Sequence, residues 1–432
     1  MIRILIISFI ITVLSSEVYA GWFKDKISKN HQENEQNYNS QLENTQLENT
    51  QIDSETSSKF PAKGKTVLYN GPGKNPKVTN IRFIIQNGVR PHFSPDGNRI
   101  VFDRKNANGY YDLYISDLNG NIINSLTEGN PVFQEGAVDR SKGNGIFDKS
   151  GNYVVFIAEE PDHFADGKKY LADPGVGLFS NLWAINIQTN NAWKLTNIPI
   201  KRSLLDRQPA IAVVNPRFTP DGKTILWTER YAEGGSNNWG KWRIKAANFY
   251  VDNGVPSIKN ETVVYTPKKG TYVTLMGFTG KGQLLVAGNL DGQHEYGMDQ
   301  YIYNTRTGSL KNLTNSPDTW EEDSNVFPDG HIIYMSNQDS KYRFNFNSAN
   351  WAGQPMERDY YLMGIDGSNK ERLTYFNDPS APEYLGKRVM TVASDIHPDG
   401  KTVASTVVVD YGDKIRNVVL KIALITTNFS IH

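Results

Sequence analysis

Cysteine is absent from the whole chain of 432 residues. Its absence excludes disulfide bonds, thiol catalysis, iron–sulfur clusters and cysteine-bound zinc. An excess of charge of either sign is absent as well, because 46 basic residues balance 46 acidic residues. Without a net field, the surface has no general attraction for polyanions. The sequence therefore predicts a protein that binds neither nucleic acid nor acidic membranes.

Long apolar runs are missing, with one exception at the N-terminus. This run extends from Ile4 to Leu14, follows one basic residue and precedes small residues that end at Ala20. Its length is within the ~7–15 residues of a signal-peptide core and short of the ~20 residues that span a bilayer. We predict a signal peptide over residues 1–20, no transmembrane span after its cleavage, and a periplasmic or secreted protein. A retained, uncleaved anchor is the alternative.

Residues 21–64 have few apolar side chains and contain the direct repeat QLENTQLENTQ. Such sequence cannot bury enough apolar surface to offset the entropy of ordering. A coiled coil is the competing interpretation, but the spacing of Leu42 and Leu47 does not maintain a heptad seam. We predict a disordered low-complexity linker over residues 21–64, followed by one folded domain over residues 65–432.

The tripeptide Pro-Asp-Gly occurs four times, each time between two short apolar runs. The four segments are FSPDGNRIVF from Phe93, FTPDGKTILW from Phe218, VFPDGHIIYM from Val326 and IHPDGKTVAS from Ile396. Two weaker copies are FDKSGNYVVF from Phe147 and FTGKGQLLVA from Phe278. Pro presets φ for a turn and Gly takes a left-handed position, so each segment predicts a β-hairpin. Six such hairpins in one chain indicate a repeat fold.

Two further strands follow the hairpins. The third strand is rich in β-branched and aromatic residues, as in the segment YYDLYISDLNGN from Tyr110. The fourth strand ends in a Leu-Thr pair in four of the units: Leu126-Thr127, Leu195-Thr196, Leu313-Thr314 and Leu373-Thr374. Each unit is therefore predicted to be a four-stranded antiparallel meander.

A single meander exposes its edges, whereas blades arranged around an axis keep their edges short and protected. The segment NIRFIIQNG from Asn80 resembles a fourth strand without partners, and the last unit ends after its third strand, near residues 417–427. The sequence therefore predicts an all-β fold. We expect a six-bladed β-propeller of four-stranded antiparallel blades, closed by an N-terminal strand. An open array of meanders is the alternative.

The run RPHFSPDGNRIVFDRKNANGYYDLYISDLNGNIINSLT, from Arg90 to Thr127, closely resembles the Pro-Asp-Gly propeller repeat of the TolB family. The resemblance extends over about residues 80–427 and implies the six-bladed propeller fold. Related blades occur in the periplasmic TolB protein, in prolyl oligopeptidase and dipeptidyl peptidase propellers, and in oligogalacturonate lyases. The resemblance therefore implies a fold and does not select one activity.

The sequence departs from these relatives in two ways. TolB proteins carry an α/β domain before the propeller, and the segment 21–79 is too short and too polar to be one. The peptidases carry an α/β-hydrolase domain after the propeller, and this sequence has no Gly-x-Ser-x-Gly motif. We therefore expect a TolB-like propeller that lacks the N-terminal domain and lacks serine peptidase activity.

Long connections are expected on one face of the propeller. The turns that join strands one to two and three to four are short, and they define the short-loop face. The connections between strands two and three and between blades are long, and they define the long-loop face. Loops on a rigid scaffold often carry binding residues, and Trp, Tyr and Arg dominate interface energetics. The predicted binding residues on the long-loop face are Tyr231, Trp239, Tyr342, Arg343, Phe344 and Trp351. Packing of the loops onto the propeller is the alternative role.

Polar residues of the first strands form a second candidate site, because the first strand of each blade lines the central axis. The predicted channel-mouth residues are His92, Glu135, Arg217, Glu322, Asp323, Asn325 and Asp395. Convergence of such groups would suit a ligand or a cation. A solvated channel wall is the alternative.

No metal site, cofactor or catalytic residue is predicted. The seven His residues do not share the short spacing of a ligand pair. We predict an exported, non-catalytic propeller that binds a protein or a cell-envelope component through its long-loop face. The alternative is an exported enzyme that acts on a polysaccharide, similar to an oligogalacturonate lyase, with its site at the channel mouth.

Overall fold

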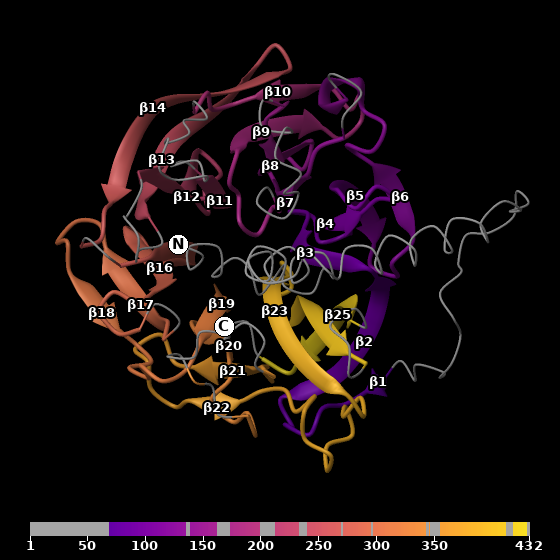
Figure 1. Ribbon diagram of the computed structural model, residues 1–432, viewed down its shortest axis with the longest axis vertical. Coiled ribbons are helices and arrows are strands. Elements are labelled where there is room, and N and C mark those ends of the chain that lie inside the picture. Colours follow the sequence, from indigo (N-terminus) through magenta and orange to yellow (C-terminus); the bar gives the residue numbers. More distant parts are fainter. Residues whose placement is uncertain are drawn as a thin grey trace, which may run out of the picture.

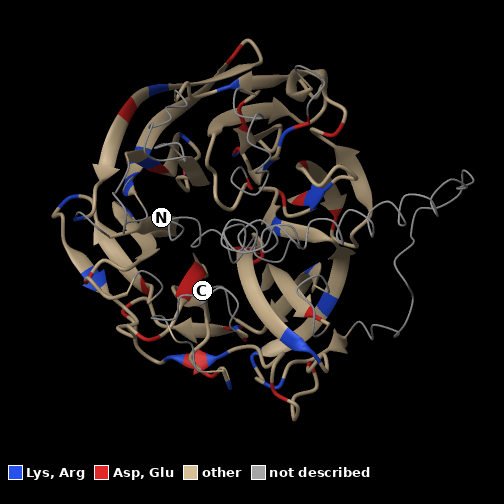
Figure 2. Cartoon of the chain, viewed as in Figure 1, with Lys and Arg blue, Asp and Glu red and all other residues tan. Residues whose placement is uncertain are grey.

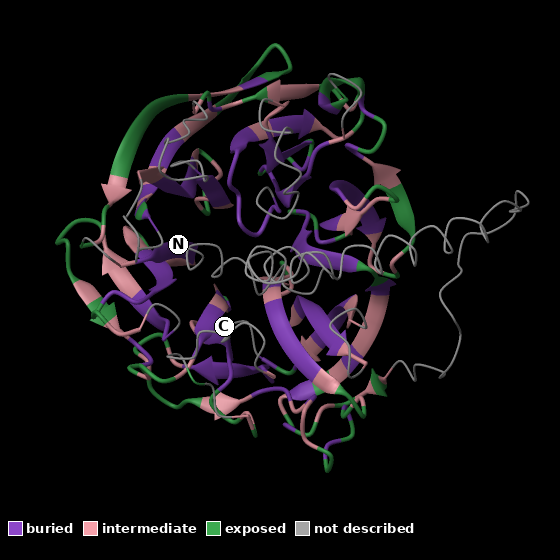
Figure 3. Ribbon diagram, in the orientation of Figure 1, coloured by how far each residue is buried: buried purple, intermediate pink, exposed green. Residues whose placement is uncertain are grey.

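The computed structural model describes residues 69–134, 139–161, 173–198, 212–232, 240–268, 271–294, 297–342, 345, 355–411 and 418–429. These residues form six antiparallel sheets arranged in a ring around a central axis (Figure 1). The fold is an all-β, six-bladed β-propeller, as the sequence predicts. The first strand of each blade lies nearest the axis, and Figure 3 shows that most of these inner strands are buried.

The six blades follow one another along the chain. Blade 1 contains β3 (Gly88–Phe93), β4 (Arg99–Lys105), β5 (Tyr111–Asp117) and β6 (Ile122–Ser125). A 3-10 turn, η2 (Pro131–Phe133), precedes blade 2, which contains β7 (Lys142–Phe147), β8 (Tyr153–Glu159), β9 (Ser180–Asn186) and β10 (Ala192–Lys194). Blade 3 contains β11 (Ala212–Phe218), β12 (Thr224–Ala232), β13 (Lys241–Asp252) and β14 (Val255–Tyr265).

The second half of the ring has the same organisation. Blade 4 contains β15 (Val273–Gly280), β16 (Gln283–Gly288), β17 (Asp299–Asn304) and β18 (Leu310–Asn312). Blade 5 contains β19 (Glu321–Val326), β20 (Ile332–Ser336), β21 (Asp359–Met363) and β22 (Glu371–Arg372). Blade 6 contains β23 (Arg388–Ile396), β24 (Thr402–Asp410), β25 (Val418–Thr427), β2 (Val78–Gln86) and β1 (Asn70–Gly71).

The Pro-Asp-Gly turns close their hairpins as predicted. Gly97 and Gly222 have φ values of 73° and 75°, which residues with a side chain rarely adopt. The turn Asp accepts a hydrogen bond from the backbone N–H two residues further on, at 3.1 Å from Asn98 and at 3.1 Å from Lys223. The geometry of the turn therefore depends on both the Asp and the Gly.

A repeated hydrogen bond joins strands three and four, and we call it the Thr latch. The Thr of each Leu-Thr pair donates its hydroxyl at 2.8 Å to an Asp or Asn at the start of strand three: Thr127 to Asp112, Thr196 to Asn181, Thr314 to Asp299 and Thr374 to Asp359. The same hydroxyl accepts the backbone N–H of the residue after that Asp or Asn, at 2.9–3.0 Å. Because a buried polar group is costly without partners, the latch satisfies both side chains at once.

Blade 6 closes the ring with the N-terminal strand, as predicted. β2 pairs antiparallel with β25, from Val78 opposite Thr427 to Gln86 opposite Lys421. β1 adds a short fifth strand beside β2, which the sequence did not indicate. Figure 1 shows the indigo β2 beside the yellow strands of the C-terminal end. Both ends of the described chain therefore belong to one sheet.

Blade 3 differs from the other blades in its outer half. β13 and β14 are long strands joined by a tight turn at Asn253 and Gly254, where both residues have positive φ. β14 is the outer edge of its sheet, and much of it is exposed (Figure 3). This blade has no Leu-Thr pair in the sequence, and its strands three and four pair over a longer stretch, from Ile244 opposite Tyr265 to Asp252 opposite Val255.

Neighbouring blades contact each other through the turns between strands three and four. A Cβ atom added at Gly120, where φ is 85°, would lie 2.0 Å from the carbonyl oxygen of Ile84 in β2. In blade 2, Asn190 Nδ2 donates to the carbonyl oxygen of Ser125 in blade 1 at 3.2 Å. These short turns therefore serve as contacts between blades.

The predicted signal peptide and linker, residues 1–64, lie outside the described residues, as does the predicted start of the folded domain at residue 65. In the described part of the chain, no helix combines the length and the apolar character that a membrane span requires.

Candidate functional site

Every inner strand contains a β-bulge near its middle. In blade 1 the bulge lies between Val89 and His92, and a matching register shift occurs in the first strand of each other blade. Four of these bulges contain a residue other than Gly with positive φ: Arg90 (50°), Asn144 (53°), Asn215 (50°) and Asp323 (47°). Because a bulge bends the strand and re-aims a side chain, it accounts for polar groups that gather near the axis.

Hydrogen bonds between blades hold the bulges in place. Asn144 Nδ2 donates to Asn215 Oδ1 at 3.0 Å, and Asn215 Nδ2 donates to Thr274 Oγ1 at 2.7 Å, which links blades 2, 3 and 4. Asn325 Nδ2 donates to the carbonyl oxygen of Ser394 at 2.7 Å, which links blades 5 and 6. Satisfied polar networks of this kind make the surrounding structure rigid. The inner ring is therefore a firm frame for side chains at the axis.

Arg217 of blade 3 extends past blade 2 toward blade 1. Its Nη1 lies 3.5 Å from His92 Nε2, although blade 2 separates the two residues in the ring. His92 Nδ1 lies 3.5 Å from Asp395 Oδ2 of blade 6, and the same oxygen accepts the backbone N–H of Phe93 at 2.8 Å. Side chains from three blades therefore meet at this level of the axis.

The charge state of His92 follows from its surroundings. The side chain is buried, with 6% of its surface exposed. Burial and the Arg217 guanidinium lower the pKa of His92, while Asp395 opposes this effect. Burial also lowers the pKa of Arg217, against Asp395 and Asp323. His92 is therefore held neutral at neutral pH, between a cation and an anion.

Arg90 is held by two acids on the side of the ring formed by blades 1 and 2. Its Nε donates to Asp103 Oδ2, and its Nη1 donates to Asp173 Oδ1 at 3.5 Å. Asp103 also accepts the backbone N–H of Asn144 at 2.9 Å. Burial raises the pKa of Asp103 to about 6, although Arg90 and Asn144 lower it. This buried ion pair fixes the bulge of blade 1 against blade 2.

β19 of blade 5 begins with three consecutive acids, seen as the red stretch at the inner end of this blade in Figure 2. Trp320 Nε1 donates to Glu322 Oε2 at 3.1 Å. Burial and the neighbouring charge of Asp323 raise the pKa of Glu322. Burial also raises the pKa of Asp323, while Arg358, Arg217 and Arg90 lower it. Arg217 and Arg90 belong to blades 3 and 1. The pKa of Asp323 therefore depends on charges in blades other than its own.

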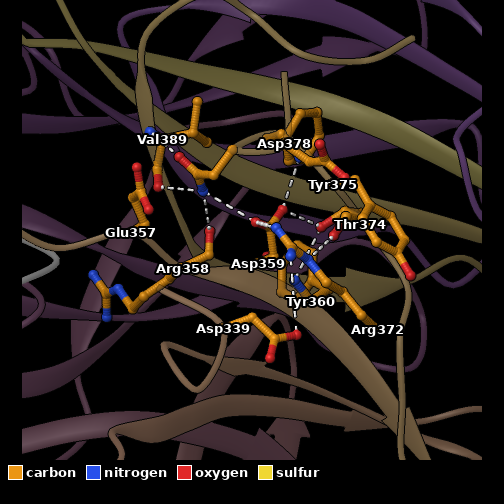
Figure 4. A network of polar contacts seen from close by, with 12 residues as sticks. Asp339, Glu357, Arg358, Asp359, Tyr360, Arg372, Thr374, Tyr375, Asp378 and Val389 are labelled. Carbon is orange, nitrogen blue, oxygen red and sulfur yellow. Dashed lines mark hydrogen bonds and ion pairs between the residues drawn. The ribbon is translucent and has the colours of Figure 1, made fainter. Parts of the chain in front are cut away.

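Arg358 lies between blades 5 and 6, immediately before β21. Its backbone N–H donates to the carbonyl oxygen of Val389 at 3.1 Å, and its carbonyl oxygen accepts the N–H of Thr391 at 3.2 Å. Figure 4 shows the guanidinium directed away from the hydrogen-bonded network around Asp359. Burial lowers the pKa of Arg358 to about 10, against the opposing effect of Asp323 and Glu322.

The predicted channel-mouth residues lie at two levels of the axis. His92, Arg217, Asn325 and Asp395 each stand three residues before the Pro of a Pro-Asp-Gly turn, so they lie toward the short-loop face. Glu322 and Asp323 stand nearer the start of their strand, and they lie toward the long-loop face, together with Arg358. The seventh residue, Glu135, lies outside the described residues.

Two of the six predicted residues on the long-loop face are described. The guanidinium of Arg243 lies 4.7 Å from the centroid of the Tyr231 ring. Tyr342 lies near two cations, with Lys341 Nζ at 5.0 Å and the Arg388 guanidinium at 5.8 Å from its ring centroid. The other four predicted residues, Trp239, Arg343, Phe344 and Trp351, lie outside the described residues.

A small pocket of about 180 Å³ lies beside Tyr231. Its lining residues come from the ends of β12 and β13 and from the connection between blades 3 and 4: Tyr231, Gly240, Lys241, Trp242, Pro267, Lys268 and Thr271. A larger pocket of about 630 Å³ lies at the rim between blades 1 and 2, and Asn130, Asn190 and Trp193 are among its lining residues. The smaller pocket is lined only by segments of the long-loop face, whereas the larger one is lined by the connection between blades 1 and 2 and by the turn between strands three and four of blade 2.

Arg358 is not among the predicted site residues, because it lies outside the first strands that line the axis. It stands instead between a long connection and strand three. The available signal is a charged triplet, Glu357-Arg358-Asp359, that leads directly into the apolar strand from Tyr360. Charged residues at the border of a buried strand need partners. A charged triplet at this position therefore indicates side chains that take part in ionic or hydrogen-bonded contacts.

No group of three or more His, Asp or Glu side chains in the described part of the chain is arranged to hold a metal ion. The axial groups pair mainly with one another and with the backbone. The chemistry that the axis offers is therefore ionic and hydrogen-bonded recognition, through guanidinium donors and partly neutralised carboxyl groups.

The sequence matches no protein-family model and no curated protein. Solved structures similar to this chain include TolB proteins and other propellers. TolB from Acinetobacter baumannii is 11% identical with a TM-score of 0.44, and the match covers 77% of this chain and 64% of that chain. Oligogalacturonate lyase from Vibrio parahaemolyticus is 13% identical with a TM-score of 0.44, and the match covers 83% and 96% of the two chains. A gluconolactonase from Xanthomonas campestris is 10% identical with a TM-score of 0.47, and the match covers 83% and 97%.

The chain thus spans less than two thirds of the length of the TolB chain. At these identities the likeness concerns the propeller fold, and no activity follows from it.

Proposed function

We propose that this chain is an exported, non-catalytic propeller that binds a protein or a cell-envelope component through its long-loop face. The pocket beside Tyr231 is the observation that supports it. All its lining residues belong to segments at the long-loop face, and Tyr231 is stacked against Arg243. Tyr, Trp and Arg side chains that are held on a rigid scaffold are typical anchors of protein interfaces.

A crosslinking pull-down from an envelope extract tests this proposal. The bait is the chain from residue 21 to residue 432, with Tyr231→Ala and Tyr342→Ala as variants. The matched control is Tyr250→Ala, because Tyr250 is 43% exposed near the end of β13 that turns into β14, away from the long-loop pocket. We expect the first two variants to lose a partner that the control retains. Equal capture by all three variants would contradict the proposal.

Export is proposed on the sequence pattern of residues 1–20, with residues 21–64 as a tether between the signal and the propeller. Sequencing of the N-terminus of the chain recovered from the periplasm or the medium tests it. The expected first residue is Gly21. Recovery of Met1, or retention of the chain in the cytoplasm, would exclude a cleaved signal.

A polysaccharide-active enzyme is the second candidate, and the acids of blade 5 favour it. Glu322 and Asp323 have raised pKa values beside Arg358, and buried acids with raised pKa values are typical of general acids. The test is a panel of neutral and acidic polysaccharides assayed with and without a chelator. Turnover that Glu322→Gln abolishes would support an enzyme, and its absence on every substrate would exclude this candidate.

A further inference from the structure

Arg358 carries a guanidinium edge without an acceptor. Its side chain is almost fully buried, and Nε and Nη2 have no hydrogen-bond partner among the described residues. The remaining nitrogen, Nη1, contacts Met335 Sδ at 3.4 Å, and the guanidinium lies 5.8 Å from the centroid of the Trp320 ring. Neither contact supplies an oxygen acceptor. A buried cation in this state is costly, because its lost hydration is not replaced.

The two unpartnered nitrogens have a geometry that selects one kind of acceptor. Nε–H and Nη2–H project in parallel from the same edge of the planar guanidinium. This edge matches the two oxygens of a carboxylate, which bind it in a bidentate manner. A single acceptor atom satisfies only one of the two donors.

Asp323 supplies an unpartnered acceptor whose charge acts on Arg358. Its Oδ2 is buried and has no hydrogen-bond partner in the described part of the chain. Arg358 acts on the charge of Asp323, and Asp323 acts on the charge of Arg358, yet no hydrogen bond joins them. Asp323 as a whole is partly exposed. A molecule between the two residues therefore needs an acceptor at one end and a donor at the other.

Arg90 does not offer an equivalent site. One of its nitrogens, Nη2, is also unpartnered, but Asp103 and Asp173 already bind the other two. Two carboxylates next to Arg90 repel a third anion. Arg358 has no such ion pair among the described residues, and the charges of Asp323, Glu322 and Tyr360 act on it.

We propose that Arg358 and Asp323 form a binding site for a small hydroxy acid. The carboxylate binds the Nε and Nη2 edge of Arg358, and a hydroxyl of the same molecule donates to Asp323 Oδ2. The hydroxyl is required because a simple anion would meet the charge of Asp323 without a donor for it. This site goes beyond the proposed partner binding, since it needs neither a protein partner nor a reaction.

Calorimetric titration of the full-length chain tests the site. The probes are gluconate and lactate, with glucose and propionate as matched compounds that lack the carboxylate or the hydroxyl. We expect at least one hydroxy acid to bind. The matched compound that lacks its carboxylate or its hydroxyl should bind at least about tenfold more weakly. Absence of binding by both hydroxy acids at millimolar concentration would overturn the proposal.

Two variants separate the roles of the residues. Arg358→Lys keeps the charge but removes the bidentate edge, so it should weaken the hydroxy acid about tenfold or more. Asp323→Asn should weaken the hydroxy acid. Propionate should bind no more weakly than to the wild type, because the variant removes the charge that opposes a simple anion. Arg306→Lys, in an exposed turn of blade 4, is the control and should match the wild type.

Thermal unfolding of each variant shows whether it is folded. If Arg358→Lys does not fold, the Asp323→Asn titration decides. Hydroxy-acid affinity within about twofold of the wild type in a folded variant at either position would overturn the site.

Discussion

Arg217 Nη1 lies 3.5 Å from His92 Nε2, although these residues belong to blades 3 and 1. Blade 2 stands between them in the ring, so the contact joins two blades that are not neighbours. Asp395 of blade 6 faces the other nitrogen of the same imidazole. The pKa of His92 therefore depends on the relative positions of blades 1, 3 and 6.

Replacing Arg217 with Met is expected to raise the pKa of His92, because the guanidinium is one of the groups that lower it. Asp395→Asn is expected to lower it further, since Asp395 has the opposite effect. NMR titration of the His92 ring measures both. An unchanged pKa in both variants would show that burial alone sets the value.

The Thr latch of blade 4 should contribute measurably to stability. Thr314→Val keeps the shape of the side chain but removes the Thr314 hydroxyl, which donates to the buried Asp299 at 2.8 Å. The loss should reduce the free energy of unfolding by about 1–3 kcal/mol. Thr307→Val, in an exposed turn of the same blade, is the control and should cost less than about 0.5 kcal/mol. Urea denaturation compares them, and equal stability would show that the latch is dispensable.

Glu321 gives the fold a pH dependence of defined sign. Burial raises its pKa from 4.5 to about 7, although the Ser336 hydroxyl donates to it at 3.2 Å. The folded chain holds this proton more tightly than the unfolded chain, so this residue lowers the free energy of unfolding as the pH rises through that interval. Glu321→Gln removes the effect.

The variant should therefore gain about 1–3 kcal/mol relative to the wild type on going from about pH 4 to about pH 8. Denaturant unfolding at both pH values measures the gain, with the exposed Glu261→Gln as the control. A constant difference between variant and wild type would contradict the raised pKa.

Two glycines with similar backbone geometry separate conformational strain from close packing. Gly120 and Gly109 have φ values of 85° and 82°. A Cβ at Gly120 would lie 2.0 Å from the Ile84 carbonyl oxygen, whereas a Cβ at Gly109 meets nothing within 4 Å. Both Gly→Ala changes should cost about 1–2 kcal/mol from the left-handed conformation. Gly120→Ala should cost about 2 kcal/mol more, because blades 6 and 1 must separate there. Similar unfolding midpoints for the two variants would contradict this contact.

Much of the fold could be predicted because its signals are local. A Pro-Asp-Gly turn fixes its own hairpin, and each Leu-Thr pair ends a strand whose Thr bonds an Asp or Asn about fifteen residues earlier, as between Thr314 and Asp299. The segment before the first hairpin stood out as a strand without neighbours, which gave the closure of the ring. The long strands of blade 3 and the short β1 carry no such signal.

The axial site could be predicted only in part, because its contacts depend on the curvature of the whole ring. Arg217 and His92 are 125 residues apart, and nothing near either residue indicates that they meet. The unpartnered oxygen of Asp323 cannot be told in the sequence from that of a solvated acid. Arg358 follows a long connection, where charge is ordinary. The roles proposed for Tyr231 and Tyr342 stay predictions until partner capture is measured.

The pairing of β2 with β25 determines which part of the fold can form last during synthesis. Thr79 and its partner Thr426 are separated by 347 residues, so β2 is synthesised long before its neighbour exists. Contacts of such sequence separation form late, and unpaired strand edges associate readily with other chains. A nascent chain that stops before Val418 leaves both β24 and β2 as open edges. Resistance to aggregation is therefore acquired only when the last strand is in place.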